Sequence, residues 1–231
     1  MDLKDKQSLQ SLNSKVVLIT GSSIGIGAAI AEEFAKEGSQ VVITYNSNKE
    51  KAEKVKQNCE RLGAAKTLII QLDVTRNESI KAAVKKVVED LGKIDILVNN
   101  AGVFAEGTVE KTTFEGIENQ VRVNVEGLIK MTHASLPYLK GAIVNIASRA
   151  GLVAYPPYST YGATKWAVRG FSKSLAGETD LPVYIINPTG TATQMNDFEG
   201  DPPEKVARIV VDVVSGKIPA KSGDDVDVWK Y

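Results

Sequence analysis

Thr20-Gly21-Ser22-Ser23-Ile24-Gly25-Ile26-Gly27 is the stretch of this chain that decides its fold. It follows a short β-branched run at 15–20 (KVVLIT) and opens a segment at 25–38 with the apolar spacing of a helix. Glycines at a strand-to-helix turn permit a tight bend, a close approach of the backbone to a ligand, and close packing of helix on sheet. The unpaired N–H groups at the start of such a helix favour a phosphate. The turn therefore predicts a pyrophosphate site in an α/β fold.

Outward from this turn, apolar runs alternate with amphipathic segments. The expected strands lie at 15–20, 40–45, 67–72, 94–99, 142–147 and 183–187, with 226–231 (VDVWKY) as a candidate seventh. The expected helices lie at 25–38, 49–62, 77–91, 112–139 (one long helix or two), 160–175 and 203–215. Nearly continuous apolar strands that alternate with helices indicate βαβ units covered on both faces. The sequence predicts one α/β domain over 1–231, with a ragged N-terminus at 1–14: a Rossmann-type, doubly wound parallel sheet of six or seven strands with helices on both faces.

The composition argues against several classes of function. Lys plus Arg and Asp plus Glu both number 28, so the charge balance gives no reason to expect nucleic acid or an anionic membrane as a partner. A single cysteine, Cys59, leaves no internal disulfide, and a single histidine, His133, cannot build a His-based zinc site or a Ser-His pair with any redundancy. We therefore predict no metal site. No apolar run approaches the roughly 18 residues of a membrane span, and the polar N-terminus is unlike a secretory signal, so we expect a soluble, cytoplasmic protein.

A second informative stretch is Tyr161-Gly162-Ala163-Thr164-Lys165. A tyrosine and a lysine four residues apart on a helix share one face. Because a nearby ammonium favours the phenolate, we expect Lys165 to lower the tyrosine pKa from its usual value of about 10. Tyr155 and Tyr158 have no lysine four residues on, so we expect them to form pocket walls.

In their order along the chain, these motifs resemble the short-chain dehydrogenase/reductase family, whose glycine fingerprint is T-G-x-x-x-G-x-G. The resemblance covers nearly the whole chain. The further motifs stand where the family has them: Asp73-Val74, Asn99-Asn100-Ala101-Gly102, Asn124, Ser148, Tyr161 with Lys165, Asn187-Pro188 and Thr193. The overall pattern is similar to that of 3-oxoacyl-[acyl-carrier-protein] reductases, and the helix after Tyr161 also resembles that of hydroxysteroid dehydrogenases.

The resemblance implies hydride transfer between a nicotinamide and a carbonyl or alcohol carbon, assisted by four catalytic residues. Tyr161 is the implied general acid or base, and Ser148 hydrogen-bonds the substrate oxygen. Lys165 binds the nicotinamide ribose and tunes the tyrosine. Asn124 holds a water that links the lysine to solvent.

The implied cofactor contacts are Gly21, Ser23, Ile24, Gly25, Ile26, Gly27, Tyr45, Asn46, Ser47, Asp73, Val74, Asn100, Ala101, Gly102, Tyr161, Lys165, Pro188, Gly190, Thr191 and Thr193. An acid after the second strand would bind the ribose 2′-hydroxyl and repel a 2′-phosphate. No acid occurs here between Thr44 and Lys49, although Ile24 stands where many NADP-using relatives have arginine. Since the missing repulsion outweighs the missing arginine, we expect NADP(H) in preference to NAD(H).

Two departures from the family pattern lie on the substrate side. Thr189 follows Pro188 where the family usually has glycine, so we give it no glycine role. The segment at 193–202 is short for the helical flap of relatives. We therefore expect an open pocket in which Met195, Phe198 and the loop 155–158 supply most of the apolar contact.

The substrate and the assembly are less constrained. A 3-oxoacyl thioester is the favoured substrate, with a hydroxysteroid, a sugar or another alcohol as alternatives. An acyl-carrier substrate calls for basic residues at the site mouth, for which Arg122, Lys130 and Arg149 are candidates. A non-catalytic NADP-binding sensor is the alternative of another class, but it leaves Ser148 and Tyr161 unexplained. The resemblance also implies a homodimer or homotetramer built through 112–139 and 160–175.

Overall fold

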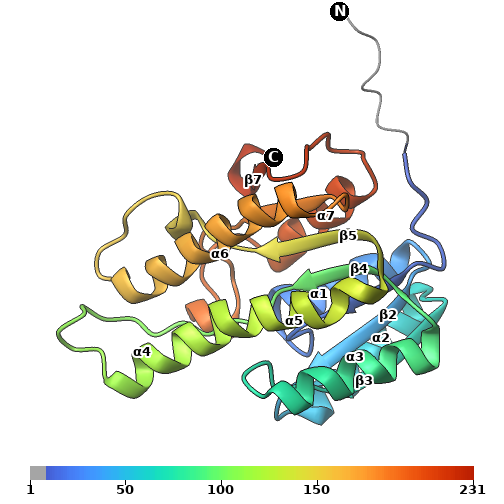
Figure 1. Ribbon diagram of the computed structural model, residues 1–231, viewed down its shortest axis with the longest axis horizontal. Coiled ribbons are helices and arrows are strands. Elements are labelled where there is room, and N and C mark those ends of the chain that lie inside the picture. Colours follow the sequence, from blue (N-terminus) through green and yellow to red (C-terminus); the bar gives the residue numbers. More distant parts are fainter. Residues whose placement is uncertain (1–8) are drawn as a thin grey trace, which may run out of the picture.

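A single parallel sheet organises the molecule (Figure 1), and its seven strands have the order β3-β2-β1-β4-β5-β6-β7. The computed structural model describes residues 9–231. The strands are β1 (Val16–Ile19), β2 (Gln40–Tyr45), β3 (Lys66–Gln71), β4 (Ile94–Asn99), β5 (Leu139–Ile146), β6 (Val183–Asn187) and β7 (Asp225–Asp227). Because β1 pairs with both β2 and β4, the chain builds outward from the centre in one direction and then in the other. The predicted Rossmann-type, doubly wound sheet is confirmed.

Helices cover both faces of this sheet. One layer contains α1 (Gly25–Lys36), α2 (Lys49–Leu62) and α7 (Pro203–Val214), and the other contains α3 (Asn77–Leu91), α5 (Leu128–Ser135) and α6 (Ser159–Glu178). Side chains alternate along a strand, so Val17 and Ile19 enter the first core while Val16 and Leu18 enter the second. This is why β1 reads as an uninterrupted apolar run.

Glycines end two of the helices where the sequence predicts. Gly63 follows α2 with φ +106°, and Gly92 follows α3 with φ +80°. Both angles lie in the left-handed region that glycine adopts at low cost. The side chain of Asn48 accepts the Lys51 N–H and begins α2.

The predicted helix at 112–139 is interrupted. α4 (Phe114–Val121) runs through a π-helical turn (Arg122–Gly127) into α5, and a 3₁₀ turn (Leu136–Tyr138) follows. The prediction is wrong at its end, because Leu139 begins β5 and pairs with Ile94. β5 thus starts three residues before the predicted Ala142. Lys140 and Gly141 are not typical strand residues, so the sequence gives no sign of this start. A Cβ at Gly141 would lie 2.5 Å from the Asp95 carbonyl oxygen, so the close strand pairing requires glycine.

The described ends of the chain pack against the domain. Leu12 is 3% exposed, and its carbonyl accepts the Ser39 hydroxyl at 2.8 Å. Of the predicted ragged terminus at 1–14, Leu12 packs against the domain, the other residues of 9–14 are exposed, and residues 1–8 lie outside the described part. At the other end β7 is shorter than the predicted strand at 226–231, and a 3₁₀ turn (Val228–Lys230) follows it.

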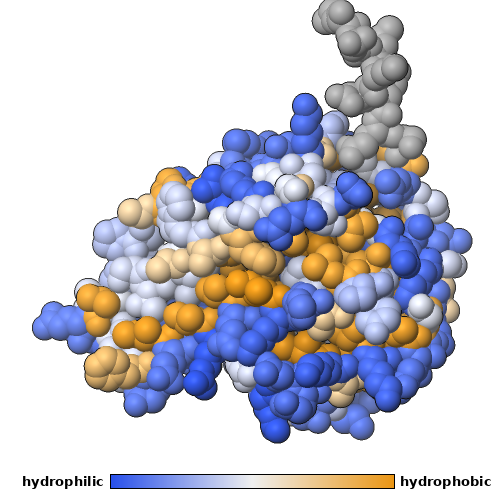
Figure 2. All heavy atoms as spheres, viewed as in Figure 1, coloured by the Kyte–Doolittle hydropathy of each residue, from blue (hydrophilic) through white to orange (hydrophobic). Residues whose placement is uncertain are grey.

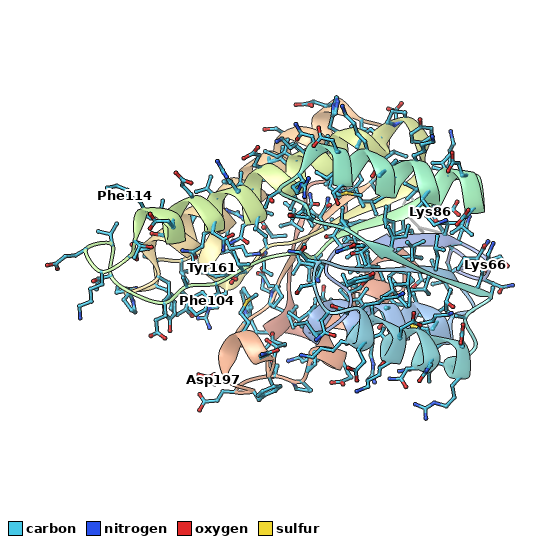
Figure 3. All side chains as sticks on the ribbon, turned by 90° about the horizontal axis from the view of Figure 1, so that it is seen from below. Lys66, Lys86, Phe104, Phe114, Tyr161 and Asp197 are labelled. Carbon is cyan, nitrogen blue, oxygen red and sulfur yellow. The ribbon has the colours of Figure 1, made fainter. Side chains whose placement is uncertain are left out.

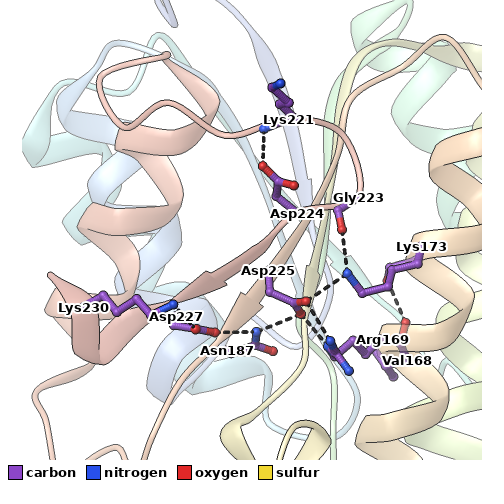
Figure 4. Close-up of polar contacts among 11 residues, drawn as sticks. Val168, Arg169, Lys173, Asn187, Lys221, Gly223, Asp224, Asp225, Asp227 and Lys230 are labelled. Carbon is purple, nitrogen blue, oxygen red and sulfur yellow. Dashed lines mark hydrogen bonds and ion pairs between the residues drawn. The ribbon is translucent and has the colours of Figure 1, made fainter.

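Polar contacts hold β7 against α6 and β6 (Figure 4). Arg169 binds both carboxylate oxygens of Asp225, with Nε at 2.6 Å and Nη2 at 2.9 Å. Asn187 Nδ2 reaches both Asp225 at 3.1 Å and Asp227 at 3.0 Å. Burial opposes the charge of Asp225, but hydrogen bonds from Arg169, Lys173 and Asn187 hold its pKa at about 2. The C-terminal strand is thereby tied to the helix that carries Tyr161.

Candidate active site

The predicted site residues gather at the carboxyl edge of the sheet, because the ends of parallel strands meet there. The turn after β1, the loops after β2 and β3, the segment after β4, Ser148 after β5 and Pro188 after β6 all leave this edge. α6 brings Tyr161 to the same place, where Figure 3 shows it beside Phe104. The two rings meet edge to face, with centroids 5.0 Å apart.

The glycine turn has the geometry of a phosphate cradle. Gly21 and Gly25 have φ values of +64° and +58°. A Cβ at Gly27 would lie 2.4 Å from Asn100 Nδ2, so only glycine fits there. α1 begins after Ile24 with no capping side chain and no acid in its first turn. The first N–H groups of α1 are therefore free to bind an anion, and these residues fit a dinucleotide pyrophosphate.

The remaining residues of the turn divide between surface and core. Ser23 is partly exposed, Ile24 is 44% exposed, and Ile26 packs partly against the core. Thr44 fixes the turn from β2, because its hydroxyl accepts the Gly21 N–H at 2.9 Å.

The segment after β4 is joined to the glycine turn by short hydrogen bonds. The Thr20 hydroxyl accepts the N–H groups of Asn100 and Ala101, both at 2.9 Å. In return, Asn100 Nδ2 donates to the carbonyls of Thr20 and Gly21, both at 3.0 Å. Gly102 follows without a side chain, between Asn124 and Lys165.

The region predicted to bind the adenosine end of the cofactor is polar, and no acidic residue stands at 45–49. Tyr45 ends β2, and Asn46 and Ser47 follow it with exposed side chains. Asp73 has a local partner: its Oδ1 accepts the N–H and the hydroxyl of Thr75 at 2.9 and 2.7 Å. Val74 is buried beside the π-helical turn.

Three of the four predicted catalytic residues lie close together, and two of them are in direct contact. Tyr161 and Ser148 share a hydrogen bond, and Ser148 Oγ also accepts the Ala150 N–H at 3.1 Å. Lys165 lies one turn further along α6, with Nζ 5.6 Å from the Tyr161 ring centroid. Its ammonium donates to the Ile146 carbonyl at 2.9 Å, which anchors α6 to the end of β5.

Burial governs the protonation of this group. It raises the pKa of Tyr161 to about 12, against the opposing effect of the Ser148 hydrogen bond. It lowers the pKa of Lys165 to about 8. The expectation that Lys165 lowers the tyrosine pKa is therefore wrong for this structure, because desolvation of the phenol outweighs the other effects. At neutral pH the site holds a protonated phenol, which is the form that can donate a proton.

Asn124 binds the loop after β4 and the helix α6, and not Tyr161 itself. Its Oδ1 accepts the Val103 N–H at 2.8 Å, and its Nδ2 donates to the Val103 carbonyl and to Thr164 Oγ1 at 2.9 and 3.1 Å. Thr164 Oγ1 in turn donates to the Tyr161 carbonyl at 2.7 Å. Asn124 thus reaches the tyrosine through Thr164, and among the described residues it makes no hydrogen bond with Lys165.

The segment after β6 folds back over the glycine turn. A Cβ placed on Gly25 would lie 3.2 Å from the Thr193 methyl group. Thr189 donates its hydroxyl to Asp201 at 3.2 Å, and Asp201 N–H donates to Gly190 at 2.9 Å. The side chain at 189 thus anchors this segment. The Pro188 carbonyl accepts the Arg149 N–H, and Thr191 is buried.

The segment after β6 is short, as predicted. Between β6 and α7 the described chain has one short 3₁₀ turn (Gln194–Asn196) and no long lid. Met195 and Phe198 are 46% and 71% exposed. Tyr158 packs edge to face on Phe104.

Sequence reasoning missed several supporting residues. Phe104 packs edge to face on Tyr161, Thr164 joins Asn124 to α6, and Gln120 Oε1 accepts the Ala105 N–H at 3.3 Å. Gln120 and Asn124 are four residues apart, which is a signal that both amides face the loop after β4. The contacts of Phe104 and Thr164 are tertiary and have no comparable signal.

The comparisons with known proteins agree on one family. A family model described as short chain dehydrogenase matches residues 15–203. Trans-4-hydroxycyclohexanecarboxylate dehydrogenase of Sinomonas cyclohexanicum is 36% identical over 78% of this chain and 74% of its own length. A 3-oxoacyl-[acyl-carrier-protein] reductase of Staphylococcus aureus is 33% identical over 81% of this chain and 79% of its own.

Solved structures agree with this. A short chain dehydrogenase from Burkholderia cenocepacia in complex with NADP has a TM-score of 0.86 and 32% identity, and the match covers 94% of this chain and 97% of that one. An alcohol dehydrogenase from the archaeon Thermococcus sibiricus complexed with 5-hydroxy-NADP has a TM-score of 0.84 and 27% identity, over 92% and 95% of the two chains.

No group of three or more His, Cys, Asp or Glu residues is placed to bind a metal ion within 9–231. In the same part of the chain, no helix has both the length and the apolarity needed to span a bilayer.

Proposed function

This chain belongs to the short-chain dehydrogenase/reductase family, and from that premise we propose that it is an NAD(P)-dependent oxidoreductase that interconverts a carbonyl and an alcohol. The observation that carries the proposal is the contact of Tyr161 with Ser148, beside buried Lys165 and at the edge of the sheet where the glycine turn lies. A nicotinamide dinucleotide supplies or accepts the hydride when it is bound.

The proposed chemistry of the protein is to orient an oxygen and move one proton. Ser148 donates a hydrogen bond to the substrate oxygen, because its Oγ already accepts the Ala150 N–H. Tyr161 is protonated at neutral pH and gives its proton to that oxygen in reduction. Lys165 places a positive charge near the phenol as the phenolate forms.

We propose that Asn124 and Thr164 position the catalytic helix and the loop after β4. Asn124 binds the loop at Val103, and Thr164 binds the backbone of Tyr161. A water carried by Asn124 would extend this contact toward Lys165, as the family resemblance implies.

NADP(H) is the cofactor that this site favours. No carboxylate stands at 45–49, so nothing at the end of β2 repels a 2′-phosphate. The two structural relatives described above were solved with NADP and with a derivative of NADP. The proposed contacts are the predicted ones, from the glycine turn to Pro188, Gly190, Thr191 and Thr193.

A 3-oxoacyl thioester remains the favoured substrate, supported by the reductase relative of Staphylococcus aureus. The dehydrogenase relative of Sinomonas cyclohexanicum supports a cyclic alcohol instead. Both are apolar enough to use the exposed side chains of Met195 and Phe198, which we expect to contact the substrate. A non-catalytic sensor is disfavoured because Ser148, Tyr161 and Lys165 are brought together.

The test is a panel of 3-oxoacyl thioesters, cyclic ketones, steroids and aldoses with NADPH and NADH, followed by cofactor absorbance. We expect Tyr161→Phe to abolish turnover while dinucleotide binding, measured by fluorescence, stays within about twofold. The matched control is Tyr138→Phe, which removes a hydroxyl from an exposed side chain in the 3₁₀ turn before β5 and should leave turnover nearly intact. Undiminished turnover by Tyr161→Phe would refute the proposed acid.

A further inference from the structure

A cavity of about 340 Å³ adjoins the glycine turn on the side of α1. Ile24 and Gly25 line it from the turn, Lys51 from α2, and Gln194 from the segment after β6. Lys51 Nζ donates to Gln194 Oε1 at 3.4 Å, a contact between residues 143 positions apart in sequence. This contact therefore joins the two segments that flank the glycine turn.

Lys51 is a cation near the end of β2. β2 pairs with β1, so residues 46–48 come beside the glycine turn. In this fold class the 2′ position of the adenosine ribose lies outside the end of that strand. The Asn48 side chain fixes the backbone of Lys51 in the first turn of α2, directly after this point.

The side chain of Lys51 is not committed to a carboxylate. On the same helix, Lys54 pairs with Glu50 at 3.0 Å and Lys56 with Glu60 at 3.8 Å. Lys51 makes no ion pair with any residue in the described range, and its contact is with the neutral amide of Gln194. It can therefore bind an anion without breaking an existing ion pair.

Two carboxylates also line this cavity, but they come from α1 and α7 and not from α2. Glu32 already accepts Asn58 Nδ2 at 2.8 Å, and it lies seven residues along α1 from Gly25, a rise of about 10 Å. Glu204 belongs to α7, and α1 packs between α7 and α2. Neither carboxylate forms an ion pair with Lys51.

We propose that Lys51 binds the 2′-phosphate of NADP(H), in place of the arginine that is absent at position 24, and exchanges Gln194 for the phosphate when it does so. The inference rests on the proposed function, since it requires a dinucleotide in the glycine turn. The exchange is favourable because an ammonium bonds more strongly to a phosphate oxygen than to an amide oxygen. Gln194 adjoins Thr193, which covers Gly25, so phosphate binding also removes the contact that joins this segment to α2.

The test is isothermal titration calorimetry of the full chain with 2′,5′-ADP and with 5′-AMP, which differ only in the 2′-phosphate. We expect Lys51→Gln to weaken 2′,5′-ADP binding about tenfold, the loss of one charge-assisted contact. Binding of 5′-AMP should stay within about twofold, which also shows that the variant is folded. Gln194→Ala should bind 2′,5′-ADP as tightly as the parent chain or more tightly.

Lys49→Gln is the matched control, because it removes the same charge from the same turn of α2. Unchanged 2′,5′-ADP binding by Lys51→Gln would overturn the inference, and so would an equal loss with Lys49→Gln. Fluorescence titration with NADH distinguishes failure of the Lys51 inference from failure of the proposed function. If the parent chain binds NADH and only the lysine result fails, the proposed function stands; if it binds neither NADH nor NADPH, the proposed function fails.

Discussion

Lys165 occupies a costly position for a charged side chain. It is 6% exposed, and in the described part of the chain it makes no ion pair; its ammonium donates to the Ile146 carbonyl. Burial without a counter-charge favours the neutral amine, and this lowers the pKa of Lys165 to about 8. Groups with strongly shifted pKa values are found more often in functional sites than elsewhere in proteins.

This pKa predicts the pH dependence of carbonyl reduction. Lys165 is charged below its pKa and neutral above it, so the turnover rate should fall as the pH rises through about 8. Tyr161 stays protonated over the same interval, because its pKa is about 12. The measurement is turnover at saturating substrate and NADPH between pH 6 and pH 10.

Lys165→Arg supplies the comparison, because a guanidinium stays charged throughout this range. In a variant that retains measurable activity, the decline near pH 8 should disappear. A parent chain whose rate is constant to pH 10 would contradict the assignment of this ionisation to Lys165.

At the scale of elements, the contact between α6 and β7 links the C-terminal strand to the catalytic helix. Arg169 binds Asp225 through two hydrogen bonds, and neither side chain is more than 21% exposed. A bidentate, partly buried pair contributes more than an exposed one. Arg149 adds a second link from the end of β5, with its guanidinium carbon 5.3 Å from the Trp229 ring centroid.

We therefore predict that Asp225→Asn lowers the free energy of unfolding by about 1–3 kcal/mol at pH 7. The carboxylate has a lowered pKa in the fold, so its stabilising effect is complete above about pH 4 and is lost as the pH falls toward 2. Urea unfolding at pH 7 and at pH 3 should show the gap between parent and variant narrowing at low pH. Asp224→Asn, which removes a charge from a turn hydrogen bond with the Lys221 N–H, should have little effect at either pH.

Elements with local signals were predictable from sequence, and those set by tertiary contacts were not. The glycine turn and the ends of α2 and α3 need a positive φ angle, which favours glycine at these positions in the sequence. Their positions were therefore predicted correctly. The start of β5 was missed, because Gly141 is explained only by its approach to Asp95. The direction of the Tyr161 pKa shift was also missed, because burial and the Lys165 contact with Ile146 arise only in the fold.

At the scale of the whole molecule, apolar side chains gather on the surface along α4 to α6 (Figure 2). Phe114 and Trp166 are 84% and 48% exposed, and Val121 and Ile129 add to the same elements. Exposed apolar residues that gather in this way mark an interaction surface. We propose that this surface joins two copies of the chain, as the family resemblance implies.

The oligomeric state tests this proposal. We expect the parent chain to elute as a dimer or tetramer in size-exclusion chromatography with light scattering, and Val121→Glu with Trp166→Glu to reduce its mass to that of smaller species. The control is Val109→Glu, an exposed apolar position outside these helices. A monomeric parent chain would refute the interface.

The π-helical turn between α4 and α5 sets the number of residues that the chain needs between its contacts on either side of this turn. One residue of an α-helix corresponds to a rotation of about 100°, so the wider turn at Arg122–Gly127 changes which way the two halves face. Gln120 and Asn124 face the loop after β4, while Met131 and Thr132 face the sheet. Deleting one residue within 122–127 would leave the composition almost unaltered but turn one half away from its partners. The length of this segment is therefore fixed by the contacts that its two halves make on either side of the turn.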